Sequence, residues 1–210
     1  MPQYRLVPFL PLLTTALLLL ASPAGARDAT PEDVEAVFAS PQGQAASRLV
    51  RLLRSDEIAH GVSRHLSRIL RGKGQLDDKQ LACMDELTVA EFNQVFTMVA
   101  FEHYEAEVIE RAFEFYSSPI GARYLRMVHE KSWRTNPDDF PLKPDRPKEG
   151  LTMEQWREVV IFKQSPLGAP FGDPRALTQS QEGLKGSALL WAVKALQCGV
   201  PEDVVRSASS

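Results

Sequence analysis

The sequence has no excess of basic residues, and it contains none of the short motifs that carry the common enzyme chemistries. Lys and Arg number 24 against 27 Asp and Glu in 210 residues, which gives a formal net charge of −3. Nucleic-acid binding needs a basic stripe and a high isoelectric point, so we expect no nucleic-acid partner. The sequence contains no HExxH, no Gly-x-Ser-x-Gly and no complete phosphate loop, because Gly72-Lys73-Gly74 lacks the rest of that last pattern.

Cysteine is also scarce, since the chain has only Cys83 and Cys198. They do not form a Cys-x-x-Cys pair, which argues against a thiol oxidoreductase. In an exported protein an even pair is first read as a disulfide, here closing a loop of 115 residues, because 198 − 83 = 115. The alternative is two buried thiols.

Long apolar runs are limited to the N-terminus. Leu6 to Leu20 is apolar apart from Thr14 and Thr15, Arg5 precedes it, and Ala24-Gly25-Ala26 follows with small-x-small spacing. This pattern predicts a signal peptide over residues 1–26 that is cleaved before Arg27. A retained anchor is the alternative, but the run is shorter than the roughly 20 residues that span a bilayer. We therefore expect a periplasmic protein without a transmembrane anchor after processing.

Strand-like alternation is absent, whereas helix-start signals recur. Thr88-x-x-Glu91 and Thr152-x-x-Gln155 are capping boxes, and Thr30 with Pro31 begins a third copy. Apolar residues at helical spacing follow each copy, so we expect an all-α, multi-helix bundle. The segment from Thr88 to Tyr116 has two apolar stripes and is predicted to be a long central helix buried on both faces.

A repeated phrase marks where helices turn. Phe115-Tyr116-Ser117-Ser118-Pro119-Ile120-Gly121 returns as Phe162-Lys163-Gln164-Ser165-Pro166-Leu167-Gly168, and Phe38-Ala39-Ser40-Pro41-Gln42-Gly43 is a shorter relative. Pro cannot continue a helix but fits the first position of a new one, and Ser is a good N-cap. We expect a sharp helix corner at each phrase. The corners are either purely structural or part of a surface for a partner, made of Phe115, Tyr116, Ser118, Pro119, Gly121, Phe162, Ser165, Pro166 and Gly168.

The prolines also suggest how the mature chain is divided. Pro137, Pro141, Pro144 and Pro147 fall within 136–150, which reads as a loop or linker. We expect a main helical part over 27–135, a C-terminal helical part over 151–200 packed on the first, and a flexible tail over 201–210. Further helices are expected at 41–54, 56–71, 76–87, 119–133, 152–163 and 176–197.

The Thr-x-x-Glu start followed by Phe-Tyr-Ser-Ser-Pro-Ile-Gly resembles the domain-of-unknown-function 2059 family of exported helical bacterial proteins. The match covers about Thr88 to Met127, and Thr152 to Gly168 is similar to a second, partial copy, with Lys163 where the family has its Tyr. The resemblance implies an all-helical envelope protein. It implies no activity and no catalytic residues.

Candidate reactive residues are few. His103 and Glu107 are four apart, and such a pair could share a metal or set up a base, but two ligands do not make a site. The simpler interpretation is a buried histidine that bonds Glu107, whereas His60, His65 and His129 are expected at the surface. Glu102, Glu105, Glu107, Glu110 and Glu114 read as a solvated helix face rather than a paired-acid hydrolase.

We therefore expect a non-enzymatic binding protein of the cell envelope, with no cofactor and no metal. Its ligand would be a protein, a peptide or an apolar molecule held between helices. The alternatives are a metal-dependent hydrolase centred on His103 and Glu107, and a neutraliser of a toxin that acts in the envelope.

Overall fold

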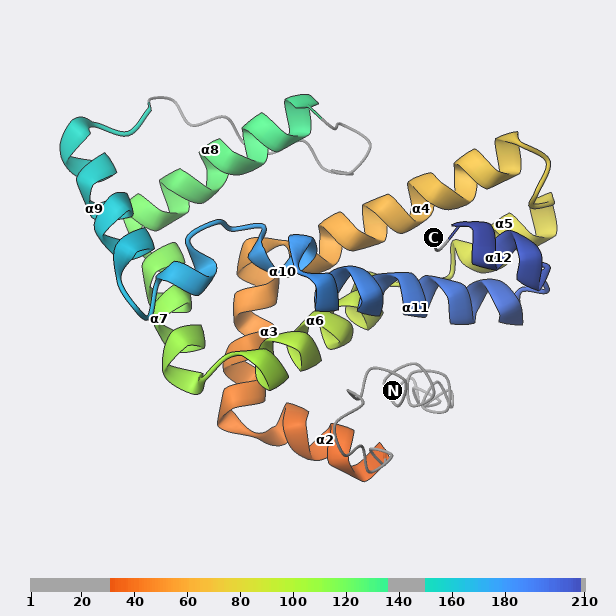
Figure 1. The fold of residues 1–210 in the computed structure, drawn as a ribbon, viewed down its shortest axis with the longest axis horizontal. Coiled ribbons are helices and arrows are strands. Elements are labelled where there is room, and N and C mark those ends of the chain that lie inside the picture. Colours follow the sequence, from red (N-terminus) through yellow and green to blue (C-terminus); the bar gives the residue numbers. More distant parts are fainter. Residues whose placement is uncertain (1–30, 136–149, 209–210) are drawn as a thin grey trace, which may run out of the picture.

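The computed structural model describes residues 31–135 and 150–208, and these form helices and loops with no β-strand. The expected signal peptide over 1–26 and most of the loop over 136–150 lie outside the described residues. The all-α, multi-helix prediction is confirmed for the described part (Figure 1). In chain order the helices are α2 (Pro31–Ala39), α3 (Pro41–Leu53), α4 (Ser55–Gly72), α5 (Asp78–Met84), α6 (Val89–His103), α7 (Ala106–Ser117), α8 (Pro119–Thr135), α9 (Met153–Gln164), the 3-10 helix η2 (Ala169–Phe171), α10 (Ala176–Gln179), α11 (Gln181–Gln197) and α12 (Glu202–Ala208).

Helix α6 lies at the centre, where α3, α4, α10 and α11 all pack against it. Almost every residue from Phe92 to Ala100 is buried, including Asn93 and Thr97. The expected burial on both faces is therefore confirmed for this helix. Its start is the predicted capping box, in which Thr88 Oγ1 accepts from the Glu91 amide at 3.3 Å and the Glu91 carboxylate accepts from the Thr88 amide at 2.8 Å.

The predicted single helix over Thr88 to Tyr116 is two helices, because α6 ends at His103 and α7 begins at Ala106. Tyr104 has extended backbone angles, although neither Gly nor Pro lies there. The side chain of Gln42, from the first turn of α3, donates to the carbonyl oxygens of Phe101 at 3.3 Å and Tyr104 at 3.0 Å. It thereby satisfies carbonyls that a continuing helix would have bonded. The break depends on this contact between distant segments.

The predicted corners are present, and each one is held by a serine hydroxyl. Ser118 Oγ donates to the Phe115 carbonyl at 2.7 Å and accepts from the Gly121 amide at 3.1 Å. Ser40 and Ser165 make the same pair of bonds. The hydroxyl therefore joins the end of one helix to the first turn that follows it. After Ser165 the chain forms η2 rather than another α-helix.

A fourth corner, at Ser180, was not predicted. The range 176–197 was expected to be one helix, but it is divided into α10 and α11. Ser180 Oγ donates to the Leu177 carbonyl and accepts from the Gly183 amide, both at 2.9 Å. No proline follows Ser180. All four corners share one sequence pattern: an apolar residue is followed three positions later by Ser, and Ser is followed three positions later by Gly. A proline after the Ser is not required.

Two copies of the phrase pack against each other and join the two parts of the chain. The rings of Phe115 and Phe162 are stacked with centroids 3.8 Å apart, and Tyr116 donates its hydroxyl to the Phe171 carbonyl at 2.7 Å. At the far end of the molecule Cys83 and Cys198 form the predicted disulfide, with Cα atoms 5.7 Å apart. The C-terminal helices are therefore fixed to the front part at both ends.

The C-terminal tail also differs from the prediction. Residues 201–210 were expected to be flexible, but α12 forms there and Val205 is buried against the core. The Val200 amide bonds the Ala195 carbonyl and Gly199 takes a positive φ of 74°, which reverses the chain after α11. Val204 and Ala208 also pack against the core, so apolar contacts hold this last helix in place.

We predict that Gly121→Ala lowers the free energy of unfolding by roughly 2–3 kcal/mol, because forced overpacking costs about that much. A Cβ at Gly121 would overlap the Phe115 carbonyl oxygen. The matched control is Gly72→Ala at the end of α4, where a Cβ meets no atom within 4 Å. Urea unfolding of both variants is the measurement, and equal stabilities would contradict the role assigned to the corner glycine.

We also predict that replacing both cysteines with serine costs about 5 kcal/mol, because the chain-entropy model assigns this to a loop of 115 residues. Urea midpoints of the oxidised wild type and of the Cys83→Ser/Cys198→Ser variant provide the comparison. Reduction of the wild type should bring it to the same midpoint as the variant. A variant as stable as the oxidised protein would show that the bond adds nothing.

Candidate functional site

An apolar cavity of about 340 Å³ opens between α4, α6 and α11. Phe92 and Phe96 from α6 and Trp191 from α11 form its inner wall, and all three side chains are buried. Trp191 is held in position because its Nε1 donates to Ser67 Oγ at 3.1 Å. At the rim, Val62 on α4 and Leu184 on α11 are 43% and 58% exposed. Apolar side chains thus continue from the cavity to the surface.

The polar residues of this lining are Ser63 and Ser132, whose side chains are buried, and four others that are at least partly exposed. Arg175, Thr178 and Gln179 come from α10 and the residue before it, and Ser187 comes from α11. Asp173 accepts two hydrogen bonds from the Arg175 side chain, and this pairing holds the pKa of the Asp173 carboxyl below its usual value. A mostly apolar cavity with a few polar groups in its lining is the usual form of a small-molecule site.

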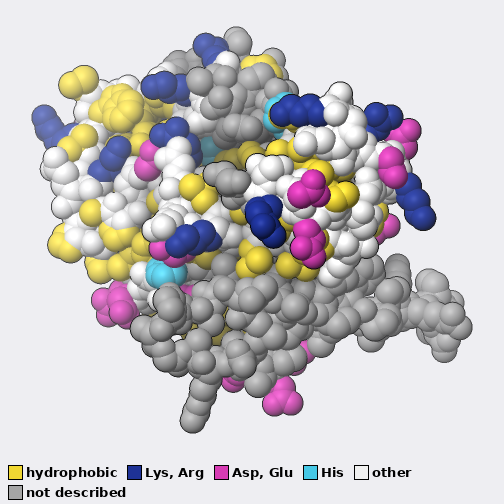
Figure 2. Space-filling view, turned by 45° about the vertical axis from the view of Figure 1, so that its right-hand side comes forward, with side chains coloured by type: hydrophobic (Ala, Val, Ile, Leu, Met, Phe, Trp, Pro, Cys, Tyr) yellow, Lys and Arg dark blue, Asp and Glu magenta, His cyan; other side chains and the backbone are white. Residues whose placement is uncertain are grey.

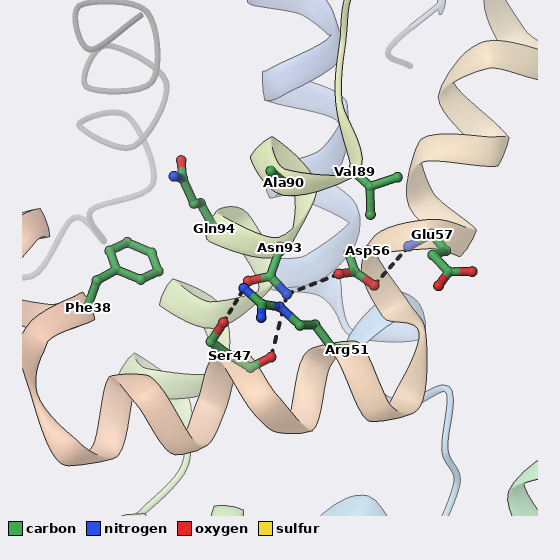
Figure 3. A pocket seen from close by; sticks show the side chains of 9 residues that line it. All are labelled: Phe38, Ser47, Arg51, Asp56, Glu57, Val89, Ala90, Asn93 and Gln94. Atoms are coloured by element: carbon green, nitrogen blue, oxygen red, sulfur yellow. Dashed lines mark hydrogen bonds between the residues drawn. The ribbon is translucent and has the colours of Figure 1, made fainter. Parts of the chain in front are cut away.

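A second cavity, of about 640 Å³, lies on the other side of α4 and α6 and has mixed walls (Figure 3). Asp56 is its central polar residue and is 4% exposed. The Asp56 carboxylate accepts from Asn93 Nδ2 at 3.0 Å and from the Glu57 amide at 2.9 Å. Ser47 Oγ in turn donates to Asn93 Oδ1 at 2.8 Å. Burial raises the pKa of the Asp56 carboxyl, and the bond from Asn93 opposes this rise.

The residues predicted to form a partner surface lie mostly in the core. Tyr116 and Phe162 are 0% and 1% exposed, and Phe115 is buried with them. Gly121 and Gly168 are buried, Ser118 and Ser165 are half-buried, and only Pro119 and Pro166 are exposed. The prediction of an accessible aromatic surface is therefore wrong for these rings, which pack inside the corners.

The opposite face of α9 is the part of this region that is open to solvent. Its exposed apolar side chains are Met153, Trp156, Val160 and Ile161. They were not singled out from the sequence, because the apolar residues of this helix lie on more than one side. Helix α9 packs on α8 and η2. This packing buries Val159 and Phe162 and leaves their neighbours Val160 and Ile161 exposed.

His103 and Glu107 do not form a pair on one helix. His103 is the last residue of α6 and Glu107 lies in α7, and both are exposed. The expectation of a buried His103 is therefore wrong. Among residues 31–135 and 150–208, no group of three or more His, Cys, Asp or Glu side chains is placed to hold a metal ion.

The histidine that is buried is His129 on α8, which was expected at the surface and is 3% exposed. It packs near the corner between α3 and α4, where Arg54 has a positive φ of 58°. Burial is the main cause that lowers its pKa to about 4, the Arg54 charge adds to the effect, and a hydrogen bond to the Leu53 carbonyl opposes it. His60 is half-buried and its Nε2 lies 3.0 Å from the Leu87 carbonyl oxygen.

The face in Figure 2 carries Lys and Arg side chains interspersed with Asp and Glu, together with scattered apolar side chains. In the part of the chain that the structure describes, no helix is long and apolar enough to cross a membrane. Comparison of the chain with models of protein families, with curated proteins and with solved structures finds no match. The resemblance to the domain-of-unknown-function 2059 family stays a prediction.

We predict that stability falls as the pH is lowered from about 6.5 to about 4, with a contribution from His129 of up to about 3 kcal/mol. Above that window the ring is neutral in both states. Within it only the unfolded chain takes up the proton, so acid favours unfolding. His129→Gln removes this contribution, and the difference in urea stability between the two chains at each pH isolates it. Parallel pH profiles would contradict the assignment.

Proposed function

We propose that the protein is exported and acts as a non-enzymatic binding protein of the cell envelope, with an apolar molecule as its ligand. The ligand occupies the apolar cavity between α4, α6 and α11. The observation that carries the proposal is the cavity lining, which combines the buried Phe92, Phe96 and Trp191 with the exposed Val62 and Leu184.

The volume and walls of this cavity support a small ligand. Small-molecule pockets have volumes of roughly 300–1,000 Å³ and mostly apolar walls, and the cavity measures about 340 Å³. Apolar walls offer water few hydrogen bonds. An apolar ligand that displaces this water is therefore stabilised in proportion to the apolar area it buries. The partly exposed polar residues of the lining, among them Thr178 and Ser187, are available to contact a polar end of the ligand.

Export is supported by two features of the chain. The first is the apolar run from Leu6 to Leu20 with its small-x-small site, as described above. The second is the disulfide between Cys83 and Cys198, since such bonds persist in oxidising compartments and are rare in the cytosol. An apolar ligand is sparingly soluble, and a carrier in the envelope would keep it in solution.

We predict that Val62→Asp weakens binding of N-phenyl-1-naphthylamine by roughly tenfold or more, because a charge in an apolar site is costly to desolvate. This uncharged probe becomes fluorescent in apolar surroundings, so titration of the protein with it gives the affinity directly. The matched control is Ile69→Asp. Ile69 lies on the same helix and is 40% exposed against 43% for Val62, but it does not line the cavity.

The control variant should bind the probe as the wild type does, and both variants should keep the helical circular dichroism signal. An equal loss of binding in both variants would assign the probe to the general surface rather than to the cavity. A wild type that does not bind the probe would contradict the proposal.

A further inference from the structure

Two buried serine residues line the apolar cavity, and their hydroxyl groups have no hydrogen-bond partner in the described part of the chain. Ser63 on α4 is 7% exposed and Ser132 on α8 is 8% exposed. The one hydrogen bond of Ser63 outside the helix ladder goes to its carbonyl oxygen, not to its side chain. A buried hydroxyl without a partner costs free energy, so two of them in one cavity call for an explanation.

The usual local bond of a helical serine does not account for Ser63. Such a hydroxyl often donates to the carbonyl one turn earlier. Ser67 does so, because its Oγ donates to the Ser63 carbonyl at 3.0 Å, and it also accepts from Trp191 Nε1 at 3.1 Å. The Ser67 hydroxyl is therefore fully engaged in holding the cavity wall. The Ser63 hydroxyl, one turn away on the same helix, remains available to a ligand.

The charges of the lining indicate an uncharged ligand. Among the described residues that line the cavity only Arg175 is charged. Its Nε and Nη2 atoms donate to the two carboxylate oxygens of Asp173 at 3.0 Å and 2.7 Å, so its charge is already compensated. A charged ligand would have to leave water without a free counter-charge in the lining, which is costly.

We propose that the ligand of this cavity is an uncharged alcohol or phenol whose hydroxyl group is hydrogen-bonded to Ser63 or Ser132. A hydroxyl group both donates and accepts, as a serine side chain does, so the bond can form in either direction. The apolar body of the ligand packs on Phe92, Phe96 and Trp191. This inference names the chemical class of the ligand, and it rests on the proposed function of the cavity.

The test is displacement of N-phenyl-1-naphthylamine by two ligands of similar size, 1-naphthol and 1-methylnaphthalene. The double variant Ser63→Ala/Ser132→Ala should bind 1-naphthol roughly tenfold more weakly than the wild type does, because the ligand hydroxyl is then buried without a partner. It should bind 1-methylnaphthalene at least as tightly as the wild type does. An equal change for both ligands, or no change for either, would overturn the proposal.

The two single variants then assign the bond to one serine or to both. Loss of an unpartnered buried hydroxyl should leave the protein at least as stable, so the change in preference is separate from unfolding. Urea unfolding of each variant checks this point.

The matched control is Ser55→Ala. Ser55 is also on α4, is 0% exposed and has an Oγ without a partner among the described residues, but it lines neither cavity. This variant should bind both ligands as the wild type does. A loss of 1-naphthol binding equal to that of the double variant would assign the effect to α4 in general, and this outcome would overturn the proposal.

A third ligand, 1-naphthoate, tests the absence of charge. It should bind the wild type roughly tenfold more weakly than 1-naphthol does, or worse, because its carboxylate meets no free cation. Tighter binding of 1-naphthoate would show that the ligand is an anion and would overturn the inference.

The failure of this inference is distinguishable from the failure of the proposed function. If the wild type binds the fluorescent probe and 1-methylnaphthalene, and the double variant keeps the wild-type preference, the inference is wrong and the proposed function stands. If the wild type binds neither of them, the proposed function is wrong and the inference fails with it.

Discussion

The chain changes direction at four corners, and at each one a serine hydroxyl is hydrogen-bonded to the backbone on both sides of the turn. In each corner it accepts from the amide of a glycine and donates to a carbonyl three residues upstream, as Ser118 does between Phe115 and Gly121. The glycine is required because a Cβ would overlap that carbonyl. At Ser118 and Ser165 the bonded carbonyl belongs to an aromatic residue, Phe115 or Phe162, whose ring is buried in the core. The stack of Phe115 on Phe162, and with it the position of α9 and η2, depends on these hydrogen bonds.

The arrangement around α6 explains why the molecule has two cavities of different character. Phe92 and Asn93 are consecutive residues of this helix, and they line opposite cavities. On α4, Asp56 lines the cavity of mixed walls and Ile58 lines the apolar cavity. Since α4 and α6 form a wall of both cavities, the apolar and the polar lining come from one pair of packed helices.

The sequence was most informative where a local rule applies. The capping boxes at Thr88 and Thr152 and the three Ser-Pro-x-Gly corners lie where they were predicted, because these interactions reach only three or four residues along the chain. The fourth corner at Ser180 could have been found from its spacing to Leu177 and Gly183, which repeats that of the others. It was not predicted because Gln181, rather than proline, follows Ser180.

The cavities were not predictable in this way. Asp56, Asn93 and Gln94 have no spacing that predicts that they line a cavity, and the aromatic residues that did stand out, such as Tyr116, are buried. His129 lies in a polar stretch of sequence, yet the corner of α3 and α4 covers it. An aromatic residue in a repeated motif can lie in the core or at the surface. Only the residues that pack around it in the folded structure determine whether it is buried.

The sequence by itself determined that the chain is helical, where most helices begin, and that two cysteines were available to form one bond. Those properties depend on hydrogen bonds and torsion angles within a few residues. The tertiary structure alone decided that the long helix breaks at Tyr104, that Cys83 meets Cys198, and which side chains line a cavity. Each of these depends on residues tens of positions apart, such as Gln42 and Tyr104, whose contact exists only after the helices have packed.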